Sequence, residues 1–403
     1  MLWAEAAGSG VIGVSNEVTA PETEQSVWRM ALTRIPGIGA AYTKKLITIF
    51  GDAAGVFQAS WNALSLAEIP PESRKAILNF NAREELRTEL QWLSRNGIRL
   101  LYFTDPEYPQ RLLSITDAPP LLYYRGNADL NAQKTVGVVG TRSADSYGKK
   151  AAEHLIAQLG AVSPLIISGL AWGIDAAAHE AALKSKLPTV GVLGHGLGML
   201  YPSDHAPLSA KMVKNGGLLT SFAYNVKAEY FTFPIRNAIV AGLCDALVVV
   251  QTGLKGGSLI TVGFAQKYNK KIFAVPGRLS DHRSEGCNRL IQQGTSQLLT
   301  SGEQLAAEMG WSWPAGGVGS QQSLTFETAE NGAGGPDGGD KHAETRLLRL
   351  IREKDSPDID ELVECSHLDA STVALLLLRL ELRGEVTVLP GKRYRTSAAA
   401  AAG

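Results

Sequence analysis

Thr135-Val136-Gly137-Val138-Val139-Gly140-Thr141-Arg142 is the stretch that decides the fold. A short run of mostly β-branched, apolar residues ends in a glycine, a hydroxyl and a cation, and a helical pattern begins near Asp145. Four similar runs follow, at 165–167, 189–193, 246–250 and 272–275, with helical stretches between them. Such alternation is typical of parallel strands that are buried on both faces. It predicts an α/β fold with a doubly wound parallel sheet.

The residues before this sheet differ in their pattern. From 26 to 100 the apolar residues recur at helical spacing, with breaks at Pro36-Gly37 and Pro70-Pro71, which predicts a small helical domain. Residues 1–25 are small and polar without periodicity, so we expect a disordered tail. The sheet domain is then expected to occupy residues 101–311.

After the sheet, the Gly-rich and acidic composition of residues 312–341 predicts a flexible linker. Residues 342–396 contain three helical patterns and then two short strand patterns, which together describe a winged helix. The Ala-rich residues 397–403 are expected to form a tail.

Composition limits the classes of protein that this chain can belong to. Its 403 residues include 39 Lys and Arg against 39 Asp and Glu, and 45% are hydrophobic, which excludes a disordered chain and a uniformly basic, histone-like protein. The charge is uneven, because residues 134–310 hold 17 basic against 11 acidic side chains and the remainder holds 22 against 28. An anion is therefore expected to bind in the middle of the chain.

The three cysteines, Cys244, Cys287 and Cys365, form no C-x-x-C pair, so neither a disulfide framework nor a cysteine-based zinc site is indicated. A reducing, cytoplasmic location fits them best. No window approaches the roughly 20 apolar residues that a membrane helix needs, and no membrane association is expected.

Three strand-to-helix turns carry the candidate site. Gly140, Thr141, Arg142 and Ser143 follow the first strand, where free backbone N–H groups and a helix N-terminus make a phosphate cradle. The alternative is an ordinary turn with Arg142 paired to a surface carboxylate.

The other two turns are Ser168-Gly169, after the second run, and Gly257-Ser258, after the fourth. All three turns should share the carboxyl edge of the sheet, where open α/β sheets bind ligands. Near the second turn, we interpret Asp175 as a helix N-cap and His179 as a helix histidine whose hydrogen bonds are satisfied.

In the loop from Tyr224 to Asn237, basic residues alternate with aromatic residues. Bases of a single strand can stack on exposed rings such as Phe231 while Lys227 and Arg236 follow the phosphates. For Phe233 we favour burial as a loop anchor.

The motif search for catalysis is negative. There is no H-E-x-x-H spacing, no G-x-S-x-G elbow and no G-x-x-x-x-G-K-[ST] loop, so we assign no catalytic residue, metal ligand or cofactor and expect a protein that is not an enzyme. The turn Gly37-Ile38-Gly39 resembles a helix-hairpin-helix, but the same short motif occurs in domains that bind no DNA. In the last helical pattern, 369–383, the cations lie near the C-terminal end. This placement favours contact with a protein over base recognition in a DNA groove.

Taken together, these motifs resemble the DNA-processing protein A family (DprA, also called Smf). The resemblance covers about residues 26–395. It rests on Val138-Val139-Gly140-Thr141-Arg142, Ser168-Gly169-Leu170-Ala171-x-Gly173-Ile174-Asp175, Tyr201-Pro202, Phe233-Pro234-x-Arg236-Asn237, Gly257-Ser258-Leu259-Ile260-Thr261, Phe273-Ala274-Val275-Pro276-Gly277 and Gly286-Cys287-Asn288.

The resemblance implies a sterile α-motif-like domain, an extended Rossmann-like domain and a winged helix. It also implies a homodimer that binds single-stranded DNA, protects it and loads RecA onto it during natural transformation. Carried over by position, the Arg142 turn forms the core of the strand-binding pocket, with Ser168-Gly169, Lys227, Arg236-Asn237 and Gly257-Ser258 around it. Two positions depart from the family pattern: Gln251, where an acidic residue is common, and the short Lys255-Gly256 segment.

Two alternatives remain open. One is an enzyme of the phosphoribohydrolase type on a Rossmann-like fold, whose motif P-G-G-x-G-T-x-x-E carries a catalytic glutamate; this chain has Phe264 at that position. The other is a protein whose winged helix alone binds duplex DNA, which disagrees with the excess of cations in the middle of the chain.

Overall fold

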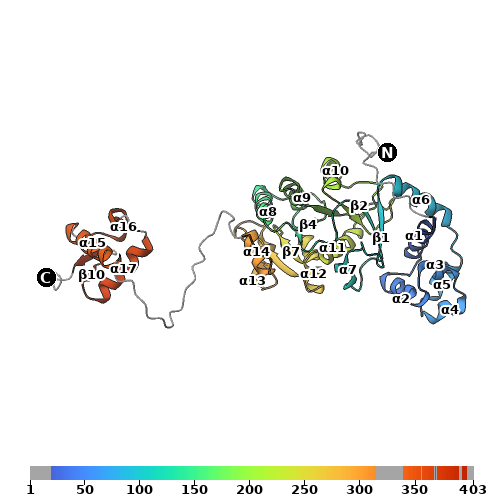
Figure 1. The fold of residues 1–403 in the computed structure, drawn as a ribbon, viewed down its shortest axis with the longest axis horizontal. Helices are drawn as coiled ribbons and strands as arrows, with labels where there is room; N and C mark the ends of the chain where they lie inside the picture. Colours follow the sequence, from blue (N-terminus) through green and yellow to red (C-terminus); the bar gives the residue numbers. More distant parts are fainter. Residues whose placement is uncertain are drawn as a thin grey trace. The chain divides into compact units, whose positions relative to one another are not determined.

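The computed structural model describes residues 20–314, 339–354, 356–366, 368, 370–389 and 393–396. These fall into two compact units, one within residues 1–319 and the other within 320–403 (Figure 1). Most of the expected N-terminal tail, most of the expected linker and the whole C-terminal tail lie outside the described residues.

The first helix begins earlier than expected. Helix α1 spans Ala20–Thr33, so residues 20–25 are helical rather than part of a tail. Glu24 explains the difference, because its carboxylate accepts hydrogen bonds from Arg83 and from Arg87, the latter at 2.6 Å from Nη2. These partners are about 60 residues away, and a local pattern does not show them.

A nine-stranded sheet forms the middle of the first unit, in the order β1-β2-β6-β5-β4-β3-β7-β8-β9. Neighbouring strands from β6 to β9 are parallel, whereas β2 is antiparallel to both β6 and β1. The bounds are β1 Arg99–Tyr102, β2 Leu121–Gly126, β3 Thr135–Val139, β4 Leu165–Ser168, β5 Thr189–Val192, β6 Gly216–Thr220, β7 Ala246–Val249, β8 Lys271–Ala274 and β9 Gln297–Leu298. The doubly wound parallel sheet is confirmed, and the five expected strands are β3, β4, β5, β7 and β8.

Strand β6 escaped the sequence analysis because it opens with Gly216-Gly217, and glycine is depleted in strands. The structure shows why glycine stands there. A Cβ on Gly217 would lie 2.5 Å from the Tyr124 ring, and one on Gly216 would lie 1.9 Å from the carbonyl oxygen of Thr189. The two glycines therefore permit close packing between β6 and its neighbours.

Helices cover both faces of the sheet, as Figure 1 shows. Helices α8, α9 and α10 lie on one side, and α7, α11 and α12 lie on the other. Their bounds are α7 Gln110–Leu113, α8 Ser146–Leu159, α9 Ile174–Lys184, α10 Ala206–Lys214, α11 Thr232–Leu243 and α12 Ser258–Lys267. The 3₁₀ turn η1 (Ser203–His205) and the helices α13 (Glu285–Gln292) and α14 (Gly302–Glu308) complete this part of the chain.

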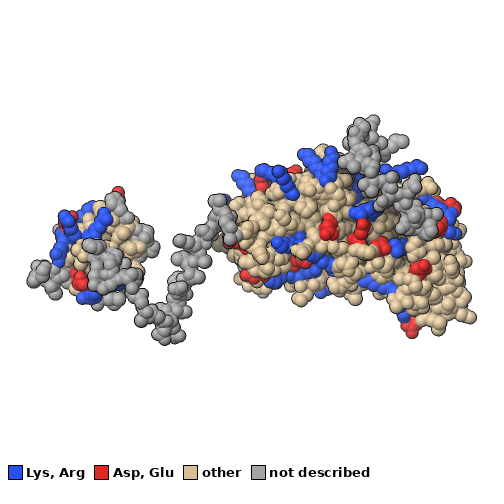
Figure 2. Space-filling model, viewed as in Figure 1, with Lys and Arg blue, Asp and Glu red and all other residues tan. Residues whose placement is uncertain are grey.

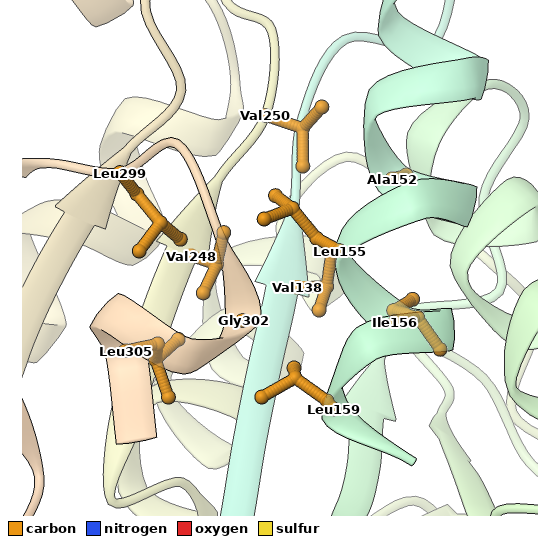
Figure 3. Close-up of a pocket in the computed structure, with 10 residues that line it drawn as sticks. All are labelled: Val138, Ala152, Leu155, Ile156, Leu159, Val248, Val250, Leu299, Gly302 and Leu305. Atoms are coloured by element: carbon orange, nitrogen blue, oxygen red, sulfur yellow. The ribbon is translucent and has the colours of Figure 1, made fainter. Parts of the chain in front are cut away.

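Helix α8 is held to the sheet by aliphatic packing. Leu155 and Leu159 of α8 meet Val138 of β3, Val248 of β7 and Leu305 of α14 around a small apolar cavity of about 10 Å³ (Figure 3). Such close packing fixes the position of α8 and, with it, the turn that joins β3 to this helix.

The N-terminal helices are α1, α2 (Ala40–Phe50), α3 (Ala53–Gln58), α4 (Trp61–Leu66), α5 (Pro71–Leu78) and α6 (Arg83–Arg95). They share one hydrophobic core with the sheet, since Leu32 and Leu93 belong to the same buried cluster as Tyr123 of β2. Trp92 also contacts Tyr224, with ring centroids 5.0 Å apart. The division expected near residue 100 therefore crosses a continuous core.

The second unit consists of α15 (Gly339–Glu353), α16 (Ile359–Ser366), α17 (Ala370–Leu382) and the antiparallel pair β10 (Val386–Leu389) and β11 (Arg393–Thr396). Leu347, Leu362 and Leu376 form its core. Three helices followed by a hairpin confirm the winged-helix prediction. Across all the described ranges, no helix combines the length and apolarity that crossing a bilayer requires.

Candidate functional site

The strand order places a ligand site between β3 and β7. The chain runs outward from β3 through β4 and β5 to β6, and then returns to β7 on the other side of β3. In open α/β sheets, the crevice at the carboxyl ends of the strands at such a switch point is where ligands bind. The turns after β3 and β7 border a hollow of about 540 Å³ here. It is lined by Val139, Gly140, Thr141, Arg142, Ala171, Asp175, Tyr230, Phe233, Pro234, Arg236, Asn237, Lys255, Gly256, Gly257, Ser258, Ile260 and Thr261.

Backbone hydrogen bonds shape the turn after β3. The Thr141 N–H donates to the carbonyl of Gln251, at 2.6 Å, and the Thr141 carbonyl accepts from the N–H of Ile174, at 3.2 Å. Arg142 is thereby held at the rim, exposed, with its Cζ 5.1 Å from the centroid of the Phe233 ring. Within the part of the chain that the structure describes, no carboxylate forms a salt bridge with Arg142. Among the described residues, Arg142 is therefore not in the surface ion pair that the alternative expects.

A buried ion pair forms one wall of the hollow. Arg236 Nη1 lies 3.4 Å from Asp175 Oδ2, and both side chains are more than nine-tenths buried. Burial lowers the pKa of Arg236, while the Asp175 carboxylate raises it. Gly169 makes room for the guanidinium, because a Cβ there would lie 1.1 Å from Nη1.

Two interpretations of this region need correction. Asp175 is not the N-cap of α9, since Gly173 occupies that position with a φ of 79° and Asp175 lies in the first turn. Arg236 belongs to the first turns of α11 rather than to a loop, because that helix begins at Thr232. His179 is only partly satisfied: it is buried and its Nδ1 lies 2.7 Å from Thr189 Oγ1, but among the described residues its buried Nε2 has no hydrogen-bond partner.

The turn after β7 supplies the opposite wall. Ser258 Oγ lies 2.7 Å from Thr252 Oγ1, and a Cβ on Gly256 would lie 2.1 Å from that same oxygen. Gly257 has open space around it, and Lys255 is exposed at the rim. This wall is thus mostly backbone, with the exposed Lys255 beside it.

Gln251 joins the loops beneath the site. Its Oε1 accepts from the Asp145 N–H at 3.4 Å, and its Nε2 donates to Asp281 Oδ2 at 3.2 Å. A hydrogen bond from Ser284 helps to lower the pKa of Asp281. An amide can donate to one loop and accept from another, which a carboxylate cannot do. The glutamine at this position, where the family pattern has an acidic residue, therefore connects two loops.

Seven of the twelve residues singled out from the sequence line the hollow. They are Gly140, Thr141, Arg142, Arg236, Asn237, Gly257 and Ser258. The other five do not line it. Ser168 is buried and donates to the carbonyl of Val138, at 2.6 Å. Gly169 packs against Arg236, while Ser143, Lys227 and Phe231 are exposed nearby along the chain.

Sequence reasoning overlooked Lys255, Tyr230 and Asp175 as site residues. Tyr230 is 90% exposed and lies in the same segment as Phe231, where cationic and aromatic residues alternate. An aromatic residue in such a segment was the signal that could have identified it as a site residue. Phe233, expected to be a buried anchor, is only half-buried, and the Arg142 guanidinium lies over its ring. On the face drawn in Figure 2, Lys and Arg side chains lie around the position that α11 and α12 occupy in Figure 1, with Asp and Glu side chains among them. Nowhere in the described ranges do three or more His, Cys, Asp or Glu side chains cluster as metal ligands would.

Comparison with known proteins agrees with this architecture. The model of the family described as DNA recombination-mediator protein A matches residues 99–310, and that of the DprA winged helix domain matches residues 335–392. Protein Smf of Escherichia coli K12 is 32% identical over 317 residues, which are 78% of this chain and 81% of that protein.

DNA processing protein DprA of Streptococcus pneumoniae R6 is 41% identical over 204 residues, 51% of this chain and 72% of that protein. The X-ray structure of DNA processing protein A from Streptococcus pneumoniae superimposes with a TM-score of 0.58 at 30% identity, covering 71% of this chain and 97% of that one. With a mediator-family match over more than half of its length, this chain belongs to the DNA recombination-mediator protein A family.

Proposed function

We propose that this protein binds single-stranded DNA without sequence preference, and that it protects the strand and loads RecA onto it during natural transformation. The observation that carries the proposal is the hollow at the switch point between β3 and β7, with the exposed Arg142 and Lys255 at its rim, neither of which forms a salt bridge with another described residue. Membership of a recombination-mediator family supports it, as does the name DNA processing protein of the relatives.

The chemistry of the hollow matches a nucleic-acid strand. Arg142 and Lys255 can neutralise phosphates, and the glycine turn at Gly256-Gly257 lets backbone N–H groups approach them closely. Tyr230 adds an exposed ring at the same place. Rings can stack on bases only when these are unpaired, so the combination favours a single strand over a duplex.

The phosphoribohydrolase alternative has no observation in its favour. Phe264, at the position where that motif has its glutamate, packs against Tyr268 with ring centroids 6.0 Å apart. A general acid or base is therefore missing from that position on α12. We infer that the protein acts by binding and not by catalysis.

The proposed partners are RecA and a second copy of this chain, in the cytoplasm where recombination takes place. We assign the second unit to protein contact, because the basic residue of α17 lies in the last turn of the helix. Arg383, which follows α17, is paired with Glu344, at 2.5 Å. A RecA-loading assay on a strand coated with single-strand-binding protein tests this step. Failure to accelerate filament formation there would refute the loading role.

Fluorescence anisotropy with labelled oligo-dT and the matching duplex, over a salt series, tests strand binding. We expect the single strand to bind more tightly, with an affinity that falls steeply as salt rises. Arg142→Ala should weaken binding and reduce the salt slope by about 0.7, the value of one phosphate contact on a single strand.

Lys211→Ala is the matched control, since Lys211 is an exposed cation on α10 that does not line the hollow. It removes the same charge and should leave binding near the wild-type level. Equal affinity for duplex and single strand, or an Arg142→Ala variant that behaves like Lys211→Ala, would refute the proposed site.

A further inference from the structure

A narrow recess adjoins the hollow on the side of β4 and β5. Arg142, Ala171, Phe233 and Arg236 line both spaces, so the two lie side by side. The recess adds residues that the hollow does not have, among them Trp172 from the β4–α9 turn and Tyr201 from the loop before η1.

Trp172 and Tyr201 are large rings left open to solvent. Trp172 is 43% exposed and Tyr201 is 49% exposed. Phe233, between them and the hollow, already has guanidinium groups against it, with the Cζ of Arg142 and Arg236 at 5.1 and 6.0 Å from its centroid. Trp172 and Tyr201 are therefore the rings of this recess with free surface.

The Trp172 ring is anchored on a buried histidine. The Trp172 indole lies against the His205 imidazole, with centroids 4.8 Å apart and planes at 62°, and His205 Nδ1 lies 3.0 Å from the Leu170 carbonyl oxygen. Rings held in this way lose little conformational entropy when a ligand stacks on them.

The Tyr201 backbone is held by a second buried histidine. Its N–H donates to His195 Nε2 at 3.2 Å, and His195 Nδ1 lies 2.9 Å from the Gly196 carbonyl oxygen. Since a carbonyl can only accept, the proton resides on Nδ1 and Nε2 is the acceptor. His195 is thus a structural support for Tyr201.

We propose that Trp172 and Tyr201 form a stacking subsite for one nucleobase of the strand whose phosphate lies at Arg142. The inference rests on the proposed function, because it requires a bound single strand. The shared wall of the recess and the cationic hollow selects this ligand: a cation for the phosphate and open rings for the base lie side by side, as single-strand sites require. Stacking accepts every base, so the subsite adds affinity without sequence preference.

Titration of wild type and Trp172→Ala with labelled oligo-dT tests the subsite. Loss of one stacked base should raise Kd about 5- to 150-fold while the salt slope stays at the wild-type value, because no phosphate contact is lost. Trp172→Phe keeps a ring and should bind almost as well as wild type. Trp61→Ala is the matched control, since Trp61 is 40% exposed, lies under Arg74 and lines neither space.

An oligonucleotide of equal length with abasic sites supplies a second readout. It keeps every phosphate and removes the bases, so wild type should lose more affinity on it than Trp172→Ala does. Tryptophan fluorescence adds a test that does not depend on Trp172→Ala folding: oligo-dT should quench wild type more strongly than Trp172→Phe.

The outcomes separate this inference from the function on which it rests. If wild type binds oligo-dT but Trp172→Ala binds equally well and both lose the same affinity on the abasic strand, the subsite is refuted and the proposed function stands. If wild type binds no oligo-dT at all, the proposed function is refuted, and the subsite with it.

Discussion

Substitution of Gly169 by alanine tests how the buried ion pair is held. The added Cβ would lie 1.1 Å from Nη1 of Arg236, 2.2 Å from its Cζ and 2.7 Å from Asp175 Oδ2. These distances leave no room for the guanidinium in its present position. The flexible Arg236 side chain must move, which separates it from Asp175.

The size of the effect follows from burial. Both partners have side-chain exposures below a tenth, at 7% and 8%, so separating them leaves charges without compensation in a poorly solvated place. Breaking a buried pair costs about 3–5 kcal/mol. At about 2 °C per kcal/mol for a unit of this size, we expect the Tm to fall by about 6–10 °C.

Thermal unfolding followed by circular dichroism measures the shift, and Gly257→Ala is the control. Gly257 has a φ of −61°, and a Cβ at this position would have no heavy atom within 4 Å. The same substitution there should therefore change Tm little. Introducing Gly169→Ala into Arg236→Met should cost much less than in wild type, because the clashing group is gone. A Tm for Gly169→Ala equal to that of Gly257→Ala, or an undiminished cost in Arg236→Met, would refute the reasoning.

Three further outcomes are expected from local changes. Gly263→Ala, at an open and exposed position within α12, should raise the free energy of unfolding in urea by about 0.5–1 kcal/mol, and a decrease would contradict this. Burial lowers the pKa of His179 to about 3, below the 6.5 of an unfolded chain, so stability should fall as pH drops from 6.5 towards 3, by at most about 1.4 kcal/mol per unit. Unfolding titrations across that range should show a shallower slope for His179→Leu, and an unchanged slope would exclude His179 as the cause. Leu155→Ala, in the packing between α8 and β3, should lower stability by about 2–5 kcal/mol in the same assay, and a change below about 1 kcal/mol would mean that the helix repacks.

Part of the site could be predicted because it is built from local signals. A strand that ends in Gly140-Thr141-Arg142 before a helix places backbone N–H groups and a cation at the sheet edge wherever the strand lies. Other members depend on distant partners. Asp175 and Arg236 are 61 positions apart, and nothing near Asp175 in the sequence distinguishes an ion-pair partner from an N-cap.

Exposure likewise depends on tertiary packing. Trp172, in the turn before α9, is open beside the hollow, whereas Trp92 of α6 packs against Tyr224. Ser168 has the residue type of a phosphate donor, although its hydroxyl is used by the Val138 carbonyl of the neighbouring strand. Residue type therefore predicts what a side chain can do, and packing determines whether it is free to do it.

The sequence by itself determined the class of fold, the strand edge that holds the site and the winged helix, because periodicity and turn chemistry act within a few residues. Only the tertiary structure decided the order of the strands, which puts β7 beside β3 and so creates the switch point. It also decided that the N-terminal helices share a core with the sheet and that Gly216-Gly217 form a strand. These features arise from contacts between segments far apart in the chain, and their energies depend on surfaces that meet only once the chain has folded.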